Sequence, residues 1–507
     1  MISTVSVSRE AAVDEGRAVR RASHRAMTTL ATIVRFHTGQ HLSDIDLHAR
    51  LSDDLMIRDP RLVRRIVWDC AVELGLGDRL SLLVERRQPQ FDTAGDIVEF
   101  LVREMFRRRN ERPKSSFDAE RYASLWRGPD DSSDEVAVEE GFPMPVEFCE
   151  GTPAEMGAQY GRNQARNLLR YIVNNVERIG LEKLKVMPEL QDCIIDPSIY
   201  FTQAEVEEIQ AMAKAADIPW EFVLGHNIGL YPAYVPGCSQ FAVSAGRNAE
   251  FGLVHAVNED SPYSLLMREH LTRVMTVRRP KGGVPYVTFG LVGTVGGLNG
   301  INAAGLIVST TLVMDRPRRR ETQHGIIQPI LTRKILEAAT TIPEAIEIIR
   351  SLRRDGSWSI CLSHFPTDRI CYVEYDGKSL LINDHQPAVV STNHAILHET
   401  MTGPTPHSIS RMDRLHAMLS LESNRGVSPS WAKNILRDGY DTSRGRVTAF
   451  PTMHTIRRID NQGSFVIVPA TGELWATAGP MAPTMADRYF RISLRRLFGE
   501  SPATSRA

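Results

Sequence analysis

A chain of 507 residues is too long for one ordinary hydrophobic core, so the sequence predicts two or more domains. Apolar residues make up 42% of the chain and charged residues 24%, which is typical of a globular protein. The 60 basic and 61 acidic residues leave a net charge of −1, so charge gives no reason to expect nucleic acid or an anionic membrane as the main partner.

The 6 cysteines are scattered and form no Cys-x-x-Cys pair, so neither a zinc site nor a dense disulfide framework is indicated. We therefore expect no metal and no cofactor. The N-terminal residues contain no apolar run that resembles a signal peptide. No stretch approaches the roughly 20 apolar residues that span a bilayer. The expected location is cytoplasmic, with no membrane span.

Residues 1–22 are polar and are expected to form a disordered tail. Residues 23–110 predict a small helical bundle. Apolar residues recur at helical spacing from about 26 to 36, again after Pro60, and from about 93 to 107. Pro60 fits the first turn of a helix, with Asp59 as its N-cap.

This order of helix, long loop and helix resembles an acyl carrier protein. The local match is Asp54-Leu55-Met56-Ile57, because a similar run leads into the second helix of carriers. On that alignment Asp59 takes the place of the serine that carries phosphopantetheine, so no prosthetic group can be attached. The resemblance implies a carrier-like domain that docks a partner or steadies the next domain. A generic small helical bundle is an equally good interpretation.

Residues 111–139 are rich in Arg, Ser, Asp and Pro, which predicts a solvated linker. Residues 140–507 predict a mixed α/β domain. Its first part has two helix starts of the capping-box kind, at Thr152 and Thr202, which indicate a helical layer. After residue 238, short alternating strands separated by helix pairs predict layered sheets with helices outside.

The stretch Val235-Pro236-Gly237-Cys238-Ser239 lies where this helical layer ends and the first strand of the sheet begins. A cysteine can be a nucleophile if one group takes its proton and another holds the resulting oxyanion. Most free cysteines are instead small buried core residues, and composition alone favours that interpretation of Cys238.

Seven short motifs follow one another in the second domain. They are Gly-Thr-Pro-Ala-Glu-Met-Gly-Ala-Gln-Tyr-Gly (151–161), Pro-Gly-Cys-Ser (236–239), Val-Asn-Glu-Asp (257–260), Gly-Ile-Asn-Ala-Ala-Gly-Leu (300–306), Thr-Asn-His (392–394), Ser-Ile-Ser-Arg (408–411) and Gly-Glu-Leu-Trp (472–475). As an ordered set they resemble the N-terminal-nucleophile (Ntn) hydrolases related to isopenicillin N acyltransferase, over roughly residues 140–499. Conjugated bile acid hydrolase and acid ceramidase are more distant relatives. The resemblance implies a four-layer αββα sandwich, an α/β (α+β) fold.

The resemblance also implies autoproteolysis. The thiol of Cys238 would attack the carbonyl of Gly237, and cleavage between them would leave chains of 237 and 270 residues. The new α-amino group has an unperturbed pKa of about 7.7–8.0, so it can act near neutral pH as general base for its own thiol. A catalytic histidine beside the cysteine is then unnecessary.

The same resemblance assigns roles to further residues. Asp260 would hold the new ammonium, and Asn258, in the same Asn-x-Asp motif, would contact substrate. Asn393 would donate its amide to the oxyanion. Ser410 and Arg411 match a Ser-Arg pair in which Arg411 steers charge near the nucleophile. Each also has a structural interpretation, as a turn residue, a capping residue or a helix-surface ion pair.

Two positions depart from the family pattern. Val257 stands where bile acid hydrolases have an arginine, and the Asn often found at the end of the Asn-x-x-Gly-Leu strand is replaced around residues 309–312. The first departure changes the local charge, and the second leaves a backbone N–H as the second oxyanion donor. Both leave the substrate open.

The favoured function is an autoprocessed cysteine hydrolase or acyltransferase, which takes the acyl group of a small amide or thioester as an acyl-thioester on Cys238. Biosynthetic acyl-transfer machinery is the partner that the carrier-like domain suggests. A plain amidase acting on N-acyl amino acids or peptides is the first alternative. A non-enzymatic interaction protein, whose carrier-like domain docks a synthase, is the second.

Overall fold

The computed structural model describes the chain in segments. These are residues 26–31, 34, 49–51, 57, 63, 66–67, 70, 91–105, 124–126, 137–179, 188–195, 197, 200–228, 237–260, 273–314, 325–399, 403–421, 426–448, 451–458, 460–478 and 488–499. The chain divides into two compact units, Met1–Arg107 and Arg108–Ala507, which are described separately. None of the described helices is long and apolar enough to cross a membrane.

The first unit contains helix α4 (Ala94–Met105), close to the helix expected over residues 93–107. Its start is closed by a reciprocal pair of hydrogen bonds: Asp96 N–H donates to Thr93 Oγ1 at 3.2 Å and Thr93 N–H donates to Asp96 Oδ2 at 2.8 Å. Ile97 and Leu101 are buried on one face, as the apolar spacing predicts. The tail at 1–22 and the carrier-like positions Asp54 and Asp59 lie outside the described residues.

Part of the segment expected as a solvated linker lies in the second unit. Trp126, in the short 3-10 helix η1 (Ser124–Trp126), is buried, and its indole N–H donates to Ala303 O at 2.6 Å. Val138 forms a β-bridge to Ile492. The ring of Trp126, although it stands among polar residues in the sequence, is thus packed inside the second unit, because burying a large aromatic ring stabilises the folded state.

The second unit is built on two large sheets. The first has eight strands in the order β1 (Val146–Gly151), β4 (Arg273–Pro280), β5 (Tyr286–Leu291), β6 (Asn299–Asn302), β7 (Leu306–Leu312), β8 (Trp358–His364), β9 (Arg369–Tyr375) and β10 (Leu380–Asn383). The second has six strands in the order β11 (Ala388–Ser391), β2 (Ser239–Val243), β3 (Val254–Asp260), β14 (Asn461–Val468), β15 (Glu473–Ala478) and β16 (Phe490–Ser493). A short hairpin, β12 (Tyr440–Asp441) and β13 (Arg446–Val447), stands apart from both.

Most neighbouring strands are antiparallel, and β1 with β4 is parallel. The strand expected after Cys238 is confirmed as β2, and it pairs with β3 in antiparallel fashion. Strand β1 starts only at Val146, after Pro143 and Pro145, which have no N–H for the sheet ladder.

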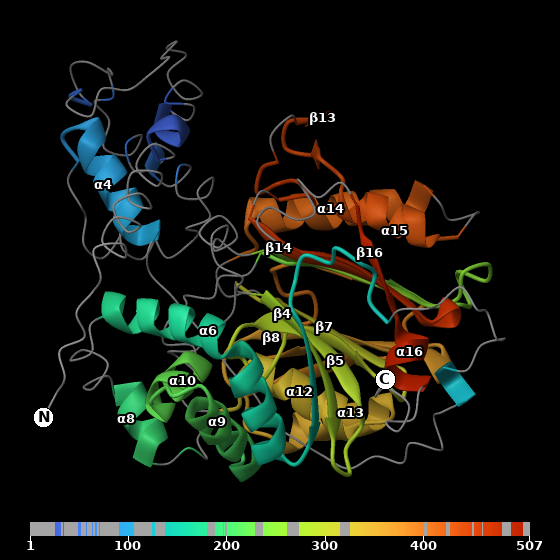
Figure 1. The fold of residues 1–507 in the computed structure, drawn as a ribbon. Coiled ribbons are helices and arrows are strands. Elements are labelled where there is room, and N and C mark those ends of the chain that lie inside the picture. Colours follow the sequence, from blue (N-terminus) through green and yellow to red (C-terminus); the bar gives the residue numbers. More distant parts are fainter. Residues whose placement is uncertain are drawn as a thin grey trace, which may run out of the picture. The chain divides into compact units, whose positions relative to one another are not determined.

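Helices cover the outer face of each sheet (Figure 1). The eight-stranded sheet packs on α6 (Pro153–Ile179), α8 (Pro188–Ile195), α9 (Gln203–Ala215), α10 (Trp220–Asn227), α12 (Gln328–Ala338) and α13 (Ile342–Ser351). The six-stranded sheet packs on α14 (Pro406–Leu421) and α15 (Pro429–Leu436). A third cluster of buried side chains fills the space between the sheets, where Phe289 and Phe465 stack with ring centroids 3.9 Å apart. Helix α16 (Leu494–Gly499) adds Leu494 and Leu497 to it. The expected four-layer αββα sandwich is confirmed.

The first motif of the domain builds the contact between α6 and α9. Thr152 and Glu155 form the predicted capping box, with Glu155 N–H donating to Thr152 Oγ1 at 3.3 Å and Thr152 N–H to Glu155 Oε2 at 2.6 Å. Gly157 and Gly161 lie one turn apart on α6. A Cβ at either position would collide with a backbone carbonyl of α9, that of Glu208 or of Met212. These glycines let the two helices approach closely.

We therefore predict that Gly161→Ala destabilises the protein by about 1–3 kcal/mol, because the added methyl forces α6 away from α9 and outweighs the better helix propensity of alanine. Urea unfolding followed by circular dichroism measures this loss. Gly246→Ala is the matched control, since a Cβ there meets only ordinary contacts at 3.7 Å. Equal stability of the two variants would contradict the prediction.

Candidate active site around Cys238

Cys238 stands immediately before β2, a central strand of the six-stranded sheet, and is fully buried. Gly237 N–H donates to Asp260 O at 2.9 Å, so the Gly237–Cys238 peptide lies against the last residue of β3. Along β2, Phe241 packs towards α14 and α15 while Ala242 packs between the sheets. Because side chains alternate between the two faces of a strand, residues around Cys238 can contact both the helix layer and the space between the sheets.

Arg411, in α14, connects three parts of this site. Its Nη1 donates to Cys238 O at 2.6 Å and to Ser239 Oγ at 2.8 Å, and its Nη2 donates to Asn393 Oδ1 at 2.6 Å. Burial and, to a smaller extent, nearby Arg458 lower the pKa of Arg411 to about 10, while Asp260 opposes the shift. The guanidinium is therefore still charged at neutral pH and holds the carbonyl of Cys238 in place.

Asn393 is held in turn by the start of α14. Its backbone N–H donates to Ser408 Oγ at 2.7 Å, and its side-chain amide donates to Leu312 O at 3.2 Å. Ser408 Oγ also bonds to Thr392 Oγ1 at 2.8 Å and to His394 Nδ1 at 2.9 Å. Ser408 was not singled out in the sequence, although it lies in the quoted motif 408–411. Ser408 lies in the first turn of α14, which begins at Pro406.

Ser410 and Asn258 have partners other than Cys238. Ser410 Oγ bonds to His454 Nδ1 at 2.9 Å. The side-chain amide of Asn258 donates to Leu436 O at 2.9 Å and to Ile456 O at 3.1 Å, so it ties β3 to the end of α15 and to the segment before β14. The structure thus brings Arg411, Asn393 and Asp260 around Cys238 and engages Ser410 and Asn258 in its supports.

Asp260 is buried at the end of β3. Asn461 Nδ2 donates to its Oδ1 at 2.7 Å, and Arg458 Nε lies 3.7 Å from its Oδ2. Burial raises the pKa of Asp260 from its usual value of 3.8 to about 7, because loss of hydration outweighs the attraction of Arg458 and because Asp460 adds repulsion.

Two charged residues that the sequence did not reveal, Arg458 and Asp460, lie near Asp260. Arg458 donates to Asp460 Oδ1 at 2.8 Å from Nε and to Oδ2 at 2.6 Å from Nη2, in a bidentate buried pair. Both precede β14, which the sheet order places beside β3. The available signal was an Arg and an Asp two residues apart just before a buried strand, a pattern too common to be specific. Val257 stands in β3 where an arginine was expected, and Arg458 supplies a cation near Asp260 from the segment before β14.

Burial raises the pKa of the Cys238 thiol well above its usual range, and the carboxyl groups of Asp260 and Glu259 raise it further. Glu259 itself pairs with Arg273 and accepts from Asn299 Nδ2. The thiol is therefore protonated in the intact chain. A group that accepts its proton has to be present before it can react as a thiolate.

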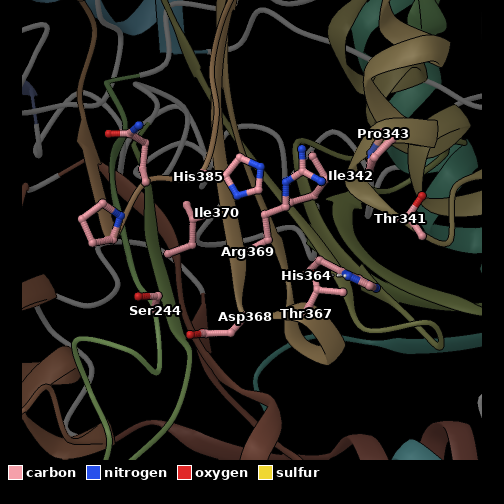
Figure 2. Close-up of a pocket in the computed structure, with 12 residues that line it drawn as sticks. Ser244, Thr341, Ile342, Pro343, His364, Thr367, Asp368, Arg369, Ile370 and His385 are labelled. Atoms are coloured by element: carbon pink, nitrogen blue, oxygen red, sulfur yellow. Dashed lines mark hydrogen bonds between the residues drawn. The ribbon is translucent and has the colours of Figure 1, made fainter.

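A separate pocket of about 530 Å³ lies beyond the other end of β2, near Ser244 (Figure 2). From 238 to 244 an extended strand spans about 20 Å, so this pocket is distinct from the Cys238 site. Its charged side chains already have partners: Arg369 pairs with Asp384, and Asp368 accepts from the backbone N–H groups of residues 245 and 246. Within the described part of the chain no cluster of three or more His, Cys, Asp or Glu could hold a metal ion.

Residues 247–458 match the family model described as "AAT: Acyl-coenzyme A:6-aminopenicillanic acid acyl-transferase". The match supports the acyltransferase family that the motifs indicated, and an enzyme of that class. It begins after Cys238, so it covers Asp260, Asn393, Arg411 and Arg458 but not the cysteine. It also leaves the first unit, and with it the carrier resemblance, without support. The comparison with curated proteins found no match.

Solved structures with some likeness include three amide hydrolases. An ortholog of N-acylethanolamine-hydrolyzing acid amidase from Caenorhabditis elegans is 14% identical, with a TM-score of 0.34 over 52% of this chain and 98% of that one. A mutant of conjugated bile acid hydrolase from Clostridium perfringens is 11% identical, with a TM-score of 0.34 over 52% and 95%. Penicillin V acylase from Agrobacterium tumefaciens is 12% identical, with a TM-score of 0.22 over 48% and 75%.

The raised pKa of Asp260 predicts how stability depends on pH. An unfolded aspartate releases its proton near 3.8, whereas Asp260 keeps it to about 7. This group therefore stabilises the folded state at low pH, and that contribution is lost as the pH rises through about 7. Measured by urea unfolding in a Cys238→Ala background, Asp260→Asn should gain roughly 2–3 kcal/mol relative to its parent between about pH 5 and pH 8. Equal pH slopes for the two chains would contradict the shift.

Asn258→Ala tests whether this residue supports the fold or contacts substrate. The change leaves the carbonyls of Leu436 and Ile456 without their donor, so the free energy of unfolding should fall by about 1–3 kcal/mol. The activity of the folded fraction should be unchanged. Unaltered stability with a selective rise in KM would instead place Asn258 in the substrate site, as the family resemblance implies.

Proposed function

We propose that this protein is an autoprocessed cysteine Ntn-hydrolase or acyltransferase with Cys238 as its nucleophile. The observation that carries the proposal is the single guanidinium of Arg411, which bonds both the carbonyl of Cys238 and the side chain of Asn393. This shared partner supports the proposal, because the residue proposed to react and the one proposed to hold the oxyanion both bond to the same buried side chain. The match to the acyltransferase family model supports the same chemistry.

The first reaction is cleavage of the chain. Cys238 Sγ attacks the carbonyl carbon of Gly237, the C–N bond between Gly237 and Cys238 breaks, and the thiol proton passes to the departing nitrogen. Water then hydrolyses the thioester, leaving a carboxylate on Gly237 and a free thiol on Cys238, and the α-amino group of Cys238 takes up the released proton as an ammonium. Each step conserves charge and needs no co-reactant other than water.

The surroundings of Asp260 suit the product of that cleavage. In the intact chain Asp260 Oδ2 and Asn461 Oδ1 are buried acceptors that receive no hydrogen bond from the described residues. Buried acceptors without donors are unfavourable by about 1–3 kcal/mol each. A new α-ammonium on Cys238 brings donors to the end of β3, where Asp260 lies. We propose that Asp260 holds this ammonium group, and that the neutral form of the same α-amino group takes the proton of the Cys238 thiol.

The second reaction is acyl transfer. The thiolate of Cys238 attacks the carbonyl of an amide or thioester, the amine or thiol leaves with a proton, and an acyl-thioester remains on the enzyme. Water or an acceptor amine then releases the acyl group. The amide of Asn393, which donates to Leu312 O at 3.2 Å in the intact chain, would turn to the negatively charged oxygen, which is the stronger acceptor.

For the first unit we propose a docking role without a prosthetic group. The support is the local resemblance at 54–57 together with Asp59, which has no hydroxyl for phosphopantetheine. A carrier-like surface of that kind would bring the enzyme to cytoplasmic biosynthetic machinery that holds acyl groups as thioesters.

Cleavage is tested directly by the Cys238→Ala variant. The purified wild-type chain should separate on a denaturing gel into fragments of 237 and 270 residues, with a new N-terminus at Cys238 by mass spectrometry. Cys238→Ala should remain one chain of 507 residues and should form no acyl adduct with candidate amides or thioesters.

Cys149→Ala is the matched control, since Cys149 is also buried but lies on β1 of the other sheet. It should cleave like the wild type. Cleavage that persists in Cys238→Ala, or a wild-type chain that stays intact after long incubation, would refute the proposed function.

A further inference from the structure

We propose that Arg458 selects glycine at position 237 and positions the Gly237–Cys238 peptide for cleavage. This inference rests on the proposed function, because it concerns the bond that would be cut. It assigns a role in processing to a residue outside all seven motifs of the sequence.

The first argument is steric. At Gly237 the guanidinium of Arg458 occupies the place of a side chain: a Cβ would collide with Arg458 Nη1 and would lie 2.5 Å from Cζ and 3.0 Å from Nη2. Gly237 does not have the positive φ that would require glycine for conformational reasons. Space alone therefore demands glycine here, and Arg458 is the neighbour that restricts it.

The second argument is that Arg458 cannot easily move aside. Nε and Nη2 are fixed by the bidentate pair with Asp460, at 2.8 and 2.6 Å. The side chain is only 5% exposed, so no solvent-filled space is open to it. Moving the guanidinium would leave the buried carboxylate of Asp460 without its partner, which makes displacement by a methyl group at 237 unfavourable.

The third argument is the position of the charge. Gly237 N–H is bonded to Asp260 O, and Arg458 Nε lies 3.7 Å from the carboxylate of the same residue. Arg411 fixes the carbonyl on the other side of Cys238. The Gly237–Cys238 peptide is thus flanked by two hydrogen bonds, from Gly237 N–H to Asp260 O on one side and from Arg411 to Cys238 O on the other, and the guanidinium of Arg458 lies against Gly237. A shift of about 1 Å in a reacting group can reduce a rate by 100-fold, so this third contact matters for the reaction.

A double-mutant cycle on the cleavage rate tests the inference. Freshly made wild-type, Gly237→Ala, Arg458→Ala and doubly substituted chains are followed on denaturing gels, with mass spectrometry to confirm the cut. We expect Gly237→Ala alone to slow cleavage about 100-fold. In the Arg458→Ala background, which is itself slower than the wild type, Gly237→Ala should have no further effect. Arg457→Ala, which changes the neighbouring arginine, should not relieve the Gly237→Ala defect.

The same cycle is repeated on stability in a Cys238→Ala chain, which cannot cleave. There Gly237→Ala should lower the urea midpoint when Arg458 is present and leave it unchanged when Arg458 is alanine. This measurement reads the contact between the two residues without relying on the reaction, and it identifies any variant that fails to fold.

Additive effects of the two substitutions on the cleavage rate, or normal cleavage of Gly237→Ala, would overturn the role of Arg458 while leaving the proposed function intact. A wild-type chain that never cuts at this bond would refute the proposed function and this inference together. Relief of the Gly237→Ala defect by Arg457→Ala would also overturn it, because the restriction would then not be specific to Arg458.

Discussion

The site depends above all on one buried guanidinium. Arg411 joins helix α14 to strand β2 through Cys238 O and Ser239 Oγ, and to the loop after β11 through Asn393 Oδ1. The guanidinium is a rigid planar fork with several donors, so it holds the three acceptors in fixed directions, whereas the donors of a lysine ammonium rotate on a flexible stem. Helix α14 covers the outer face of the six-stranded sheet. When it packs there, it also brings Arg411 to the carbonyl of Cys238 and so aligns the candidate nucleophile.

A buried cation of this kind needs anions nearby, and the arrangement of charges around Cys238 follows from that need. Arg458 pairs with Asp460 and approaches Asp260, while Arg273 pairs with Glu259. Burial nevertheless raises the pKa of Asp260 and of the Cys238 thiol, which favours their neutral forms in the intact chain. The thiol of the intact site is thus protonated. A new amino group at Cys238 would change that balance from within.

The face of β2 that packs between the two sheets provides rigidity instead of charge. Ser309 donates to Gln240 Oε1 at 2.5 Å, so His255 Nε2 must donate to Ser309, at 2.6 Å, and His255 Nδ1 accepts from Ser363 at 2.8 Å. Burial lowers the pKa of His255 to about 3, so the ring stays neutral and fits this chain of hydrogen bonds. These bonds cross the space between the two sheets. They hold the strand that carries the nucleophile against the eight-stranded sheet, which makes a shift in register costly.

Local features were readable from the sequence alone. Capping boxes at Thr152 and Thr202, the strand after Cys238 and the αββα class follow from short-range hydrogen bonding, from apolar spacing and from an ordered set of motifs. The sequence could not show that Arg458 closes on Gly237, that Ser408 holds Asn393, or that Asn258 bonds Leu436 and Ile456. Those contacts join residues far apart in the chain. They exist only because β14 pairs beside β3 and α14 packs over β2, so only the tertiary structure decides them.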